Sequence, residues 1–487
     1  MDIEATIAGL GHLIDGRIVR NDATFPVENP ATRSPIGDCP EATDDLVDAA
    51  IAAARRAQPG WYAAGDRERR RVIGAMAEAL TERLEAVVAV SALEKGAMGG
   101  AIEAYGGPAF LGHHAAAPLP VDVIEDNDER LVRVVRKPVG VVAAITPWNS
   151  PILIACVKVA GALLAGNTVV LKPSPFTPFA TLLLGEVWKD VVPPGVVNVV
   201  AGGDDTGKAL VSHPHTALIS FTGSVEAGRH IAAVAAPALK RVVLELGGND
   251  AAIVLPDVDV DLVAAQLFTS SMIMSGQVCA AVKRLYVHES IYPRMVEALA
   301  RLADAATPVP ESAGGSFGPI STRPQYERVR LLLDDALTHG AKPANAGARA
   351  DGAGYFQAPM ILTGVRPGMR VVDEEQFGPL LPVLSFRDVD EAIAAANDTP
   401  YGLCGSVWTS DIAAGERLAA RLECGTAYVN THAEVAPHIP FGGVKDSGIG
   451  RECGTAGVDG YAELQTQYVY KNPARVATAL ESGDRVV

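Results

Sequence analysis

The feature that most limits how this chain can fold is a regular alternation of short apolar runs and longer amphipathic stretches between residues 139 and 245. Such an alternation predicts an α/β fold with a doubly wound parallel sheet. The expected strands are Val139–Ile145, Thr168–Lys172, Val196–Val199, Ala217–Phe221 and Lys240–Glu245, and the expected helices are Pro151–Ala165, Pro178–Trp188, Thr206–Ser212 and Val225–Ala236. In sheets of this kind ligands bind beyond the carboxyl ends of the strands, where Asn149, Lys172, Gly223 and Glu245 fall.

A second alternating series follows Gly247 and Gly248, and we place a domain boundary at these two glycines. Its expected strands are Ala251–Leu255, Ala281–His288, Gly405–Thr409 and Gly425–Asn430, and its expected helices are Asp259–Met274, Ile291–Ala306, Arg323–His339, Asp388–Asn397 and Ile412–Leu422. Before the first series, Asp44–Arg56 and Asp66–Glu94 have the amphipathic pattern of helices. The basic run Arg67–Arg71 in the second of them is expected to be a solvated helix face.

Length and charge exclude several classes of protein. At 487 residues, a prior of about 150 residues per domain suggests roughly three units. Hydrophobic residues make up 48% and charged residues 20% of the chain, which is typical of a globular protein and unlike a disordered one. The net charge of −16 argues against nucleic acid and against an anionic membrane as partners.

The cysteines and the N-terminus indicate a reducing compartment. The six cysteines form no CxxC pair and no repeated spacing, so neither a disulfide framework nor a metal site is expected. The N-terminus is acidic and has no pattern of a signal peptide. The most apolar region, Val139–Leu171, is interrupted by prolines, asparagines and a lysine, so we expect no membrane span. Together these features predict a cytoplasmic protein.

The candidate for chemistry is Cys279, in the glycine-containing turn Ser275–Ala280 between an apolar helix-like run and a strand. A lone cysteine is most often a buried structural residue, and a nucleophilic one needs suitable neighbours. Glu245 ends a buried apolar run beside two glycines, where a general base would be placed. Asn149 ends another apolar run with an amide suited to an oxyanion. These three residues form the predicted catalytic group.

Taken together, the motifs around these residues resemble the NAD(P)-dependent aldehyde dehydrogenase superfamily over most of the chain. The matching stretches are Thr146–Asn149, Lys172–Ser174, Phe221–Ser224, Glu245–Gly248, Gly276–Cys279, Glu375–Pro379 and Pro440–Gly443, with Lys445, Ser447, Gly448, Gly450, Arg451 and Glu452. The motifs look most like those of bacterial members that act on hydrophobic aldehydes. The resemblance implies an aldehyde dehydrogenase-like α/β fold, with a Rossmann-type cofactor domain, an α/β catalytic domain and a small β-ribbon for oligomerisation.

The resemblance also implies a mechanism. The Cys279 thiolate would attack the aldehyde, and the Asn149 amide and the Cys279 backbone N–H would hold the oxyanion of the thiohemiacetal. Hydride transfer to the nicotinamide would leave a thioester, which water activated by Glu245 would hydrolyse to the carboxylic acid. Glu452 would relay a proton or orient a catalytic group.

The cofactor residues come partly from the sequence pattern and partly from the resemblance. No G-x-G-x-x-G motif follows the first strand; instead Gly223 and Ser224 precede a helix, whose N-terminus and Ser224 hydroxyl suit a pyrophosphate. Lys172, at a strand end, suits a ribose hydroxyl. The resemblance gives Glu375 a nicotinamide-ribose contact and Phe377 a packing role at the nicotinamide, and the remaining expected cofactor-binding residues are Thr146, Pro147, Trp148, Ser174, Leu246 and Gly247.

Many family members carry a glutamate three residues after the lysine, where it binds the adenosine ribose. This chain has Pro175 there, so NAD loses one support for its preference over NADP. We expect NAD as the cofactor and leave NADP open.

The expected domains are 1–120 with 138–247 for the cofactor, 248–447 for catalysis, and 121–137 with 460–487 as an oligomerisation ribbon and tail. Glu129–Lys137 alternates charged and apolar residues, and Glu463–Tyr470 would suit pairing with it. In the family such a ribbon pairs with another subunit, which implies a homodimer or homotetramer.

The substrate is the least determined property. Ser150, Ile154, Val157 and the 431–438 loop are small or aliphatic where relatives that act on small aldehydes carry aromatic side chains, which favours aromatic, terpenoid or medium-chain aldehydes. His432 and His438 in that loop are expected to lie on the surface. Two alternatives stay open: a coenzyme A-acylating semialdehyde dehydrogenase, which would need no base at Glu245, and a binding protein of the same fold without turnover.

Overall fold

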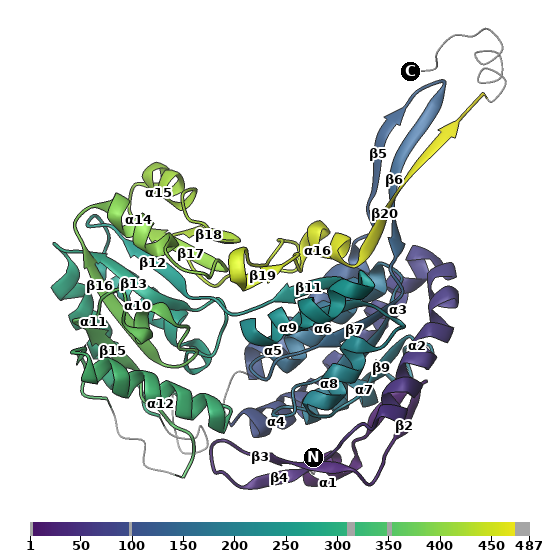
Figure 1. The fold of residues 1–487 in the computed structure, drawn as a ribbon, viewed down its shortest axis with the longest axis horizontal. Coiled ribbons are helices and arrows are strands. Elements are labelled where there is room, and N and C mark those ends of the chain that lie inside the picture. The colour runs from purple at the N-terminus through teal and green to yellow at the C-terminus, as the bar shows by residue number, and fades with distance from the viewer. Residues whose placement is uncertain (1–2, 97–99, 309–316, 348–352, 473–487) are drawn as a thin grey trace.

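The computed structural model describes residues 3–96, 100–308, 317–347 and 353–472. Two lobes are each built around a large β-sheet, and a narrow ribbon of strands projects from one of them (Figure 1). Among the described residues, no helix combines the length and the apolar character that a membrane crossing requires.

The first lobe is organised by an eight-stranded sheet in the order β19-β11-β10-β7-β8-β9-β1-β2. Its central strands run parallel and are β7 (Val141–Ile145), β8 (Thr168–Lys172), β9 (Val197–Val199), β10 (Thr216–Thr222) and β11 (Arg241–Glu245). The edges are antiparallel and are formed by β1 (His12–Ile14), β2 (Arg17–Val19) and β19 (Gly448–Ile449). The strand order reverses between β7 and β10, and in sheets of this kind ligands bind at such a point.

Helices cover both faces of this sheet (Figure 1). The strands alternate their side chains, so that Val142 and Leu171 face one helical layer while Val141 and Val170 face the other. The first layer contains α3 (Gly65–Glu82), α4 (Leu84–Lys95), α5 (Gly100–Ala116), α6 (Pro151–Leu164) and α7 (Phe179–Trp188), and the second α2 (Asp44–Ala63), α8 (Asp204–Ser212) and α9 (Val225–Ala235). Near the N-terminus, α1 (Ile3–Gly9) precedes β1, and β3 (Thr24–Glu28) pairs with β4 (Pro35–Pro40).

The second lobe contains a seven-stranded sheet in the order β14-β15-β16-β13-β12-β17-β18. Its strands are β12 (Asp250–Val254), β13 (Val282–His288), β14 (Lys342–Pro343), β15 (Met360–Thr363), β16 (Leu380–Phe386), β17 (Cys404–Trp408) and β18 (Thr426–Val429). Its helices are α10 (Val260–Met272), α11 (Tyr292–Ala305), α12 (Arg323–Thr338), α13 (Arg370–Asp373), α14 (Val389–Asn397) and α15 (Ile412–Ala419). Only residues 246–249 separate β11 of the first sheet from β12 of the second, so the two sheets meet at that short link.

The ribbon is a three-stranded antiparallel sheet in the order β20-β6-β5. It consists of β5 (Val121–Asp126), β6 (Arg130–Pro138) and β20 (Ala462–Tyr470), which follows α16 (Gly454–Gly460). The register pairs Glu463 with Lys137 and Tyr470 with Arg130, so the predicted pairing of the tail with the ribbon is present. Residues 473–487 of the predicted tail lie outside the described residues.

The predicted α/β fold is confirmed, and most of the predicted strands and helices agree with the observed ones to within a few residues. The exception is the helix predicted over Asp44–Arg56, which continues through Pro59 to Ala63. The elements that were not predicted include α1, β3, β4, α5, β5, β15, α13 and β16, and α3 and α4, predicted as one helix, are separated at Arg83. The prediction for the basic run was wrong at Arg69, which is buried because its guanidinium donates to the carbonyls of Leu164 and Tyr62, each at 3.0 Å. The domain limits stay predictions.

Candidate active site

The predicted catalytic residues come together where the two sheets meet. Asn149 follows β7 and Glu245 ends β11, both at the carboxyl edge of the first sheet. Cys279 precedes β13 and Glu375 precedes β16, both at the amino edge of the second sheet. Because one sheet contributes strand ends and the other strand beginnings, residues far apart in the sequence converge on one place.

The turn before Cys279 is held in an uncommon backbone conformation. Met274, Ser275 and Gly276 have φ angles of 52°, 59° and 74°, in the left-handed region. Glycine is required at position 276, because a Cβ there would collide with the carbonyl oxygen of Gly378. The Ser275 hydroxyl donates to the Gly318 carbonyl at 2.7 Å. The predicted glycine-containing turn is therefore present, and the hydrogen bond from Ser275 to Gly318 holds it in place.

Gln277 fastens the same turn from its other side. Its side-chain amide donates to the carbonyls of Met274 and Pro319, and its Oε1 accepts the backbone N–H of Ser321 at 2.8 Å. All the hydrogen-bonding groups of this buried side chain have partners, so the turn is rigid where the nucleophile leaves it.

Asn149 reaches across to the nucleophile turn. Its Nδ2 donates to the backbone carbonyl of Gln277 at 2.8 Å, which orients the amide and leaves its second N–H free. Burial raises the pKa of the Cys279 thiol to about 12, and the carboxylates of Glu245, Glu375 and Asp250 add to this effect, while the Lys283 ammonium opposes it. The side chain of Cys279 is half-buried.

Glu245 is 5% exposed, and neither of its carboxyl oxygens has a hydrogen-bond partner among the described residues. Its Oε1 lies against the backbone of Gly442, where any larger residue would clash. Burial raises the pKa of Glu245 well above its usual range, and repulsion from Glu452 raises it further, while Lys158 lowers it. An unpaired buried carboxyl of this kind suits a group that exchanges a proton with a substrate or a water.

Glu452 belongs to a buried network with a residue that the sequence reading did not select. Lys158 of α6 is fully buried, and its Nζ contacts Glu452 Oε1 at 2.6 Å and donates to the Ser220 hydroxyl at 3.0 Å. The Tyr461 hydroxyl is hydrogen-bonded to the Ser220 hydroxyl at 2.8 Å. The available signal was a single lysine in the otherwise uncharged helix Pro151–Leu164, because a lone buried ammonium requires an acidic partner.

The predicted residues of the adenosine end lie at the carboxyl ends of β8 and β10. Lys172 is buried at the end of β8, and burial lowers its pKa to about 8. Ser224 begins α9, and its hydroxyl accepts the backbone N–H of Ala227 at 3.2 Å, which caps the helix and leaves the hydroxyl hydrogen for a ligand. The Gly223 N–H is engaged by the carbonyl of Glu245 at 3.0 Å.

The predicted residues of the nicotinamide end lie around the link between the sheets. Glu375 Oε1 accepts the backbone N–H of Gly248 at 3.1 Å, and a Cβ at Gly247 would collide with the same carboxylate. The rings of Trp148 and Phe377 meet edge to face with centroids 5.3 Å apart. The other predicted positions, Thr146, Pro147, Ser174 and Leu246, lie at the ends of β7, β8 and β11.

The residues present fit a dinucleotide. The buried hydroxyls of Thr146 and Thr222 lack hydrogen-bond partners among the described residues, and they lie at the carboxyl ends of β7 and β10. Lys172 and Glu375 would hold ribose hydroxyls, and the N-terminus of α9 would hold phosphate oxygens. Within the described residues, no cluster of three or more His, Cys, Asp or Glu side chains could hold a metal ion.

The prediction that His432 lies on the surface was wrong. It is buried, because its Nδ1 is within 2.9 Å of the Ser406 hydroxyl and its Nε2 faces the Asp250 carboxylate at 3.8 Å. His438 is exposed as predicted, and its ring lies 6.2 Å from that of His113 on α5.

Comparisons with known proteins identify the family of this chain. The aldehyde dehydrogenase family model matches residues 18–467. The aldehyde dehydrogenase LUC3 of a Fusarium species is 37% identical over 94% of this chain and 98% of its own length, and a betaine aldehyde dehydrogenase of Rhizobium leguminosarum is 36% identical over 95% and 98%. The NAD+ complex of an aldehyde dehydrogenase from Bacillus cereus superposes with a TM-score of 0.93 at 33% identity, covering 96% of this chain and 98% of that one.

Proposed function

The chain belongs to the aldehyde dehydrogenase family and is an NAD-dependent aldehyde dehydrogenase, and from this premise we propose that it makes carboxylic acids through a covalent intermediate on Cys279. The observation that carries the proposal is the convergence of Cys279, Asn149 and an unpaired buried Glu245 at one junction. No metal is needed for this chemistry.

In the proposed reaction the Cys279 thiolate adds to the aldehyde carbonyl carbon, and the resulting oxyanion accepts hydrogen bonds from the free N–H of Asn149 and from the Cys279 backbone N–H. Bound NAD would accept the hydride from the former aldehyde carbon, which leaves a thioester on Cys279. Glu245 takes a proton from a water that attacks this thioester, so that the acid leaves and the thiolate returns.

Glu452 is the proposed destination for the proton that Glu245 takes up. Glu452 pairs with Phe441 through two backbone hydrogen bonds of 2.8 Å, and the next residue, Gly442, lies against Glu245 Oε1. After burial, the charge of Glu452 is the next cause that raises the pKa of Glu245. The Lys158 ammonium forms an ion pair with Glu452 and also donates a hydrogen bond to the Ser220 hydroxyl. A carboxyl with a raised pKa is a stronger base once ionised, which suits the hydrolytic step.

A hydrophobic substrate is proposed from the side chains around Cys279. Val278 and Cys279 pack with Tyr428 and Phe441. Phe441 also belongs to a second apolar cluster with Phe110, Leu153, Val157 and Cys453, so apolar contacts continue away from the thiol. Aromatic, terpenoid or medium-chain aldehydes suit such a lining, because each buried methylene contributes about 0.8 kcal/mol.

The proposed function is tested by reduced-nicotinamide formation with NAD over short aliphatic, long aliphatic, aromatic and terpenoid aldehydes and betaine aldehyde. We expect kcat/KM to rise roughly three- to fourfold per methylene along the aliphatic series. A preference for acetaldehyde or betaine aldehyde would contradict the hydrophobic site. An absolute requirement for coenzyme A would support the acylating alternative, and silence across the panel would support a non-catalytic protein.

Two carboxylates support NAD over NADP despite Pro175. Glu41 Oε1 accepts the N–H of Gly203, the residue that precedes α8, at 3.3 Å. Asp204 begins α8, whose Gly207 lies one turn further on against the Lys172 side chain. The carboxylates of Asp204 and Glu41 both raise the pKa of Lys172 against the larger effect of burial. A 2′-phosphate held at Lys172 would therefore meet two negative charges.

We expect Asp204→Asn combined with Glu41→Gln to raise the ratio of NADP to NAD affinity about tenfold, since each charge contributes roughly 1 kcal/mol or less near solvent. The measurement is the dissociation constant of each nucleotide by titration calorimetry without an aldehyde. Asp205→Asn is the matched control, because Asp205 is exposed on the same helical turn and pairs with Lys208. An unchanged ratio in the double variant would rule out this explanation.

The ribbon supports a homodimer or homotetramer. Its exposed apolar side chains include Val121, Val123, Ile124, Leu464, Tyr468 and Val469, which an isolated subunit would leave in water. We expect Val123→Asp with Ile124→Asp to lower the mass found by sedimentation equilibrium, with Ile412→Asp on α15 as an exposed control. A parent protein with the mass of one subunit would contradict the proposal.

Within the described chain the six cysteines are all unpaired, which supports the proposed cytoplasmic location.

A further inference from the structure

A buried ammonium lies directly behind the nucleophile turn. Lys283, the second residue of β13, is 3% exposed, and its Nζ donates to the carbonyls of Val278 at 2.8 Å and Cys279 at 2.6 Å. The Ala281 carbonyl lies 3.4 Å from the same nitrogen. The three N–H groups of one ammonium are therefore shared among the carbonyls on both sides of the cysteine.

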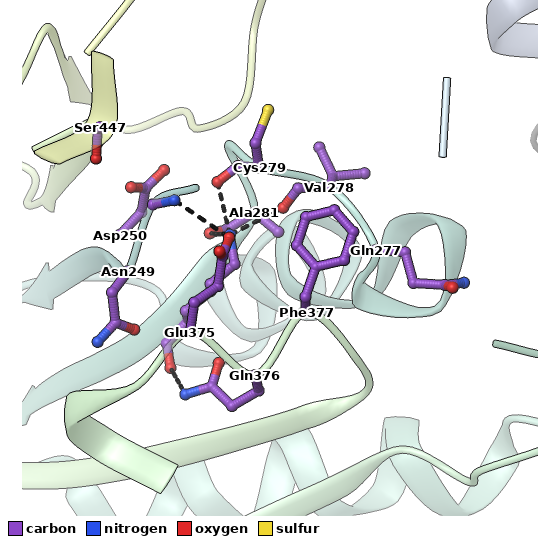
Figure 2. A network of polar contacts seen from close by, with 12 residues as sticks. Asn249, Asp250, Gln277, Val278, Cys279, Ala281, Glu375, Gln376, Phe377 and Ser447 are labelled. Carbon is purple, nitrogen blue, oxygen red and sulfur yellow. Dashed lines mark hydrogen bonds and ion pairs between the residues drawn. The ribbon is translucent and has the colours of Figure 1, made fainter. Parts of the chain in front are cut away.

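The same ammonium contacts the carboxylate at the nicotinamide end. Glu375 Oε1 lies 3.4 Å from Lys283 Nζ, and it also accepts the N–H of Gly248 from the link between the two sheets. Figure 2 shows the carbonyl of Cys279 and the carboxylate of Glu375 converging on this network, while the sulfur of Cys279 points away from it. Lys283 thus contacts both the nucleophile turn and Glu375 directly.

A fully desolvated lysine is costly, and it persists only where its charge and its hydrogen bonds are compensated. Here the compensation comes from carbonyls of residues 278–281, whose positions decide where the Cys279 N–H and thiol point. Without the ammonium, those carbonyls would lose their partner and the Glu375 carboxylate would lose its counter-charge.

We propose that Lys283 is a positioning residue that fastens the nucleophile turn to Glu375, so that the thiol and the cofactor carboxylate are held as one unit. This rests on the proposed function of Cys279 and Glu375. The charge of Lys283 also favours the thiolate. Burial and the carboxylates of Glu245, Glu375 and Asp250 raise the pKa of Cys279, and the Lys283 ammonium opposes this rise. It likewise opposes the rise that burial causes in the pKa of Glu375.

The test is the rate at which iodoacetamide alkylates Cys279 at pH 8, followed by mass spectrometry of the Cys279 peptide in the absence of aldehyde. Loss of a nearby positive charge raises a thiol pKa by about 1–3 units. Each unit lowers the thiolate fraction at pH 8 about tenfold, but the remaining thiolate is more nucleophilic, so that alkylation slows only about threefold per unit. We expect Lys283→Met to react roughly 3- to 30-fold more slowly and to bind NAD at least about fivefold more weakly by calorimetry. Lys283→Arg, which retains the charge, should react within about twofold of the parent.

Lys240→Met is the matched control, because Lys240 also binds two backbone carbonyls, those of Val211 at 2.7 Å and His213 at 2.8 Å, away from Cys279. Alkylation and NAD binding unchanged in Lys283→Met, or slowed equally in Lys240→Met, would overturn the proposal. If Lys283→Met does not fold, Lys283→Gln decides by the same criteria, since its amide still donates to carbonyls without a charge. A parent that oxidises no aldehyde while Lys283→Met still slows alkylation would refute the proposed catalysis and leave the positioning role intact.

Discussion

Cys279→Ala is expected to lower kcat for aldehyde oxidation by at least roughly 10⁴-fold, because the proposed covalent intermediate forms on the Cys279 sulfur, which alanine lacks. The loss should fall on kcat, since Asn149 and the apolar side chains proposed to contact the substrate remain. The measurement is steady-state formation of reduced nicotinamide with the best aldehyde of the panel, together with intact mass after mixing with aldehyde and NAD. The variant should show no acylated species.

Cys424→Ala is the matched control, because Cys424 is also an unpaired, half-buried cysteine and lies outside the proposed machinery. Its thiol donates to the carbonyl of Thr426 at 3.2 Å. We expect parent-like activity from this variant. Residual activity of Cys279→Ala above a hundredth of the parent rate would show that another group carries the reaction.

How well the sequence predicted the site depends on whether each residue's role is local. Asn149, Lys172 and Glu245 end apolar strands, and the end of a buried strand can be read from a short window of sequence. The turn before Cys279 was likewise predictable, because Gly276 adopts a conformation that glycine tolerates best. These positions needed no knowledge of what packs against them.

The residues that the sequence reading missed depend on partners far away in the chain. Lys158 is an unremarked lysine until β10 and the 452 region bring Ser220 and Glu452 to it, across 62 and 294 residues. His432 looks like a surface histidine until Ser406 and Asp250 enclose it. The strand β5 has an almost fully exposed burial pattern, so it lacks the alternation that marks a half-buried strand. Long-range pairing therefore accounts for Lys158 and His432, whereas the exposure of β5 accounts for the missed strand.

Glu245→Gln is expected to separate the two halves of the reaction. Addition of the thiol and loss of the hydride do not need the base, so one equivalent of reduced nicotinamide should form at a rate close to that of the parent. Hydrolysis should then slow by about 10²–10⁴-fold, the usual contribution of a general base. The measurement is a stopped-flow burst with intact mass spectrometry, in which the acyl group should accumulate on the protein.

The raised pKa of Glu245 also predicts how activity and stability depend on pH. Because burial and Glu452 raise the pKa of Glu245, the parent should gain activity as the pH rises through a value above that of an ordinary glutamate, and Glu245→Gln should lack this rise. Because the pKa of Glu245 is higher in the folded protein than in the unfolded chain, the free energy of unfolding falls as the pH rises above the unfolded-state pKa and through the folded-state pKa. The Gln variant avoids that cost and should be at least as stable as the parent at pH 8. Glu416→Gln, exposed on α15, is the control for both measurements. Steady turnover by Glu245→Gln at the parent rate, or a burst with no bound acyl group, would assign the water-activating role to another residue.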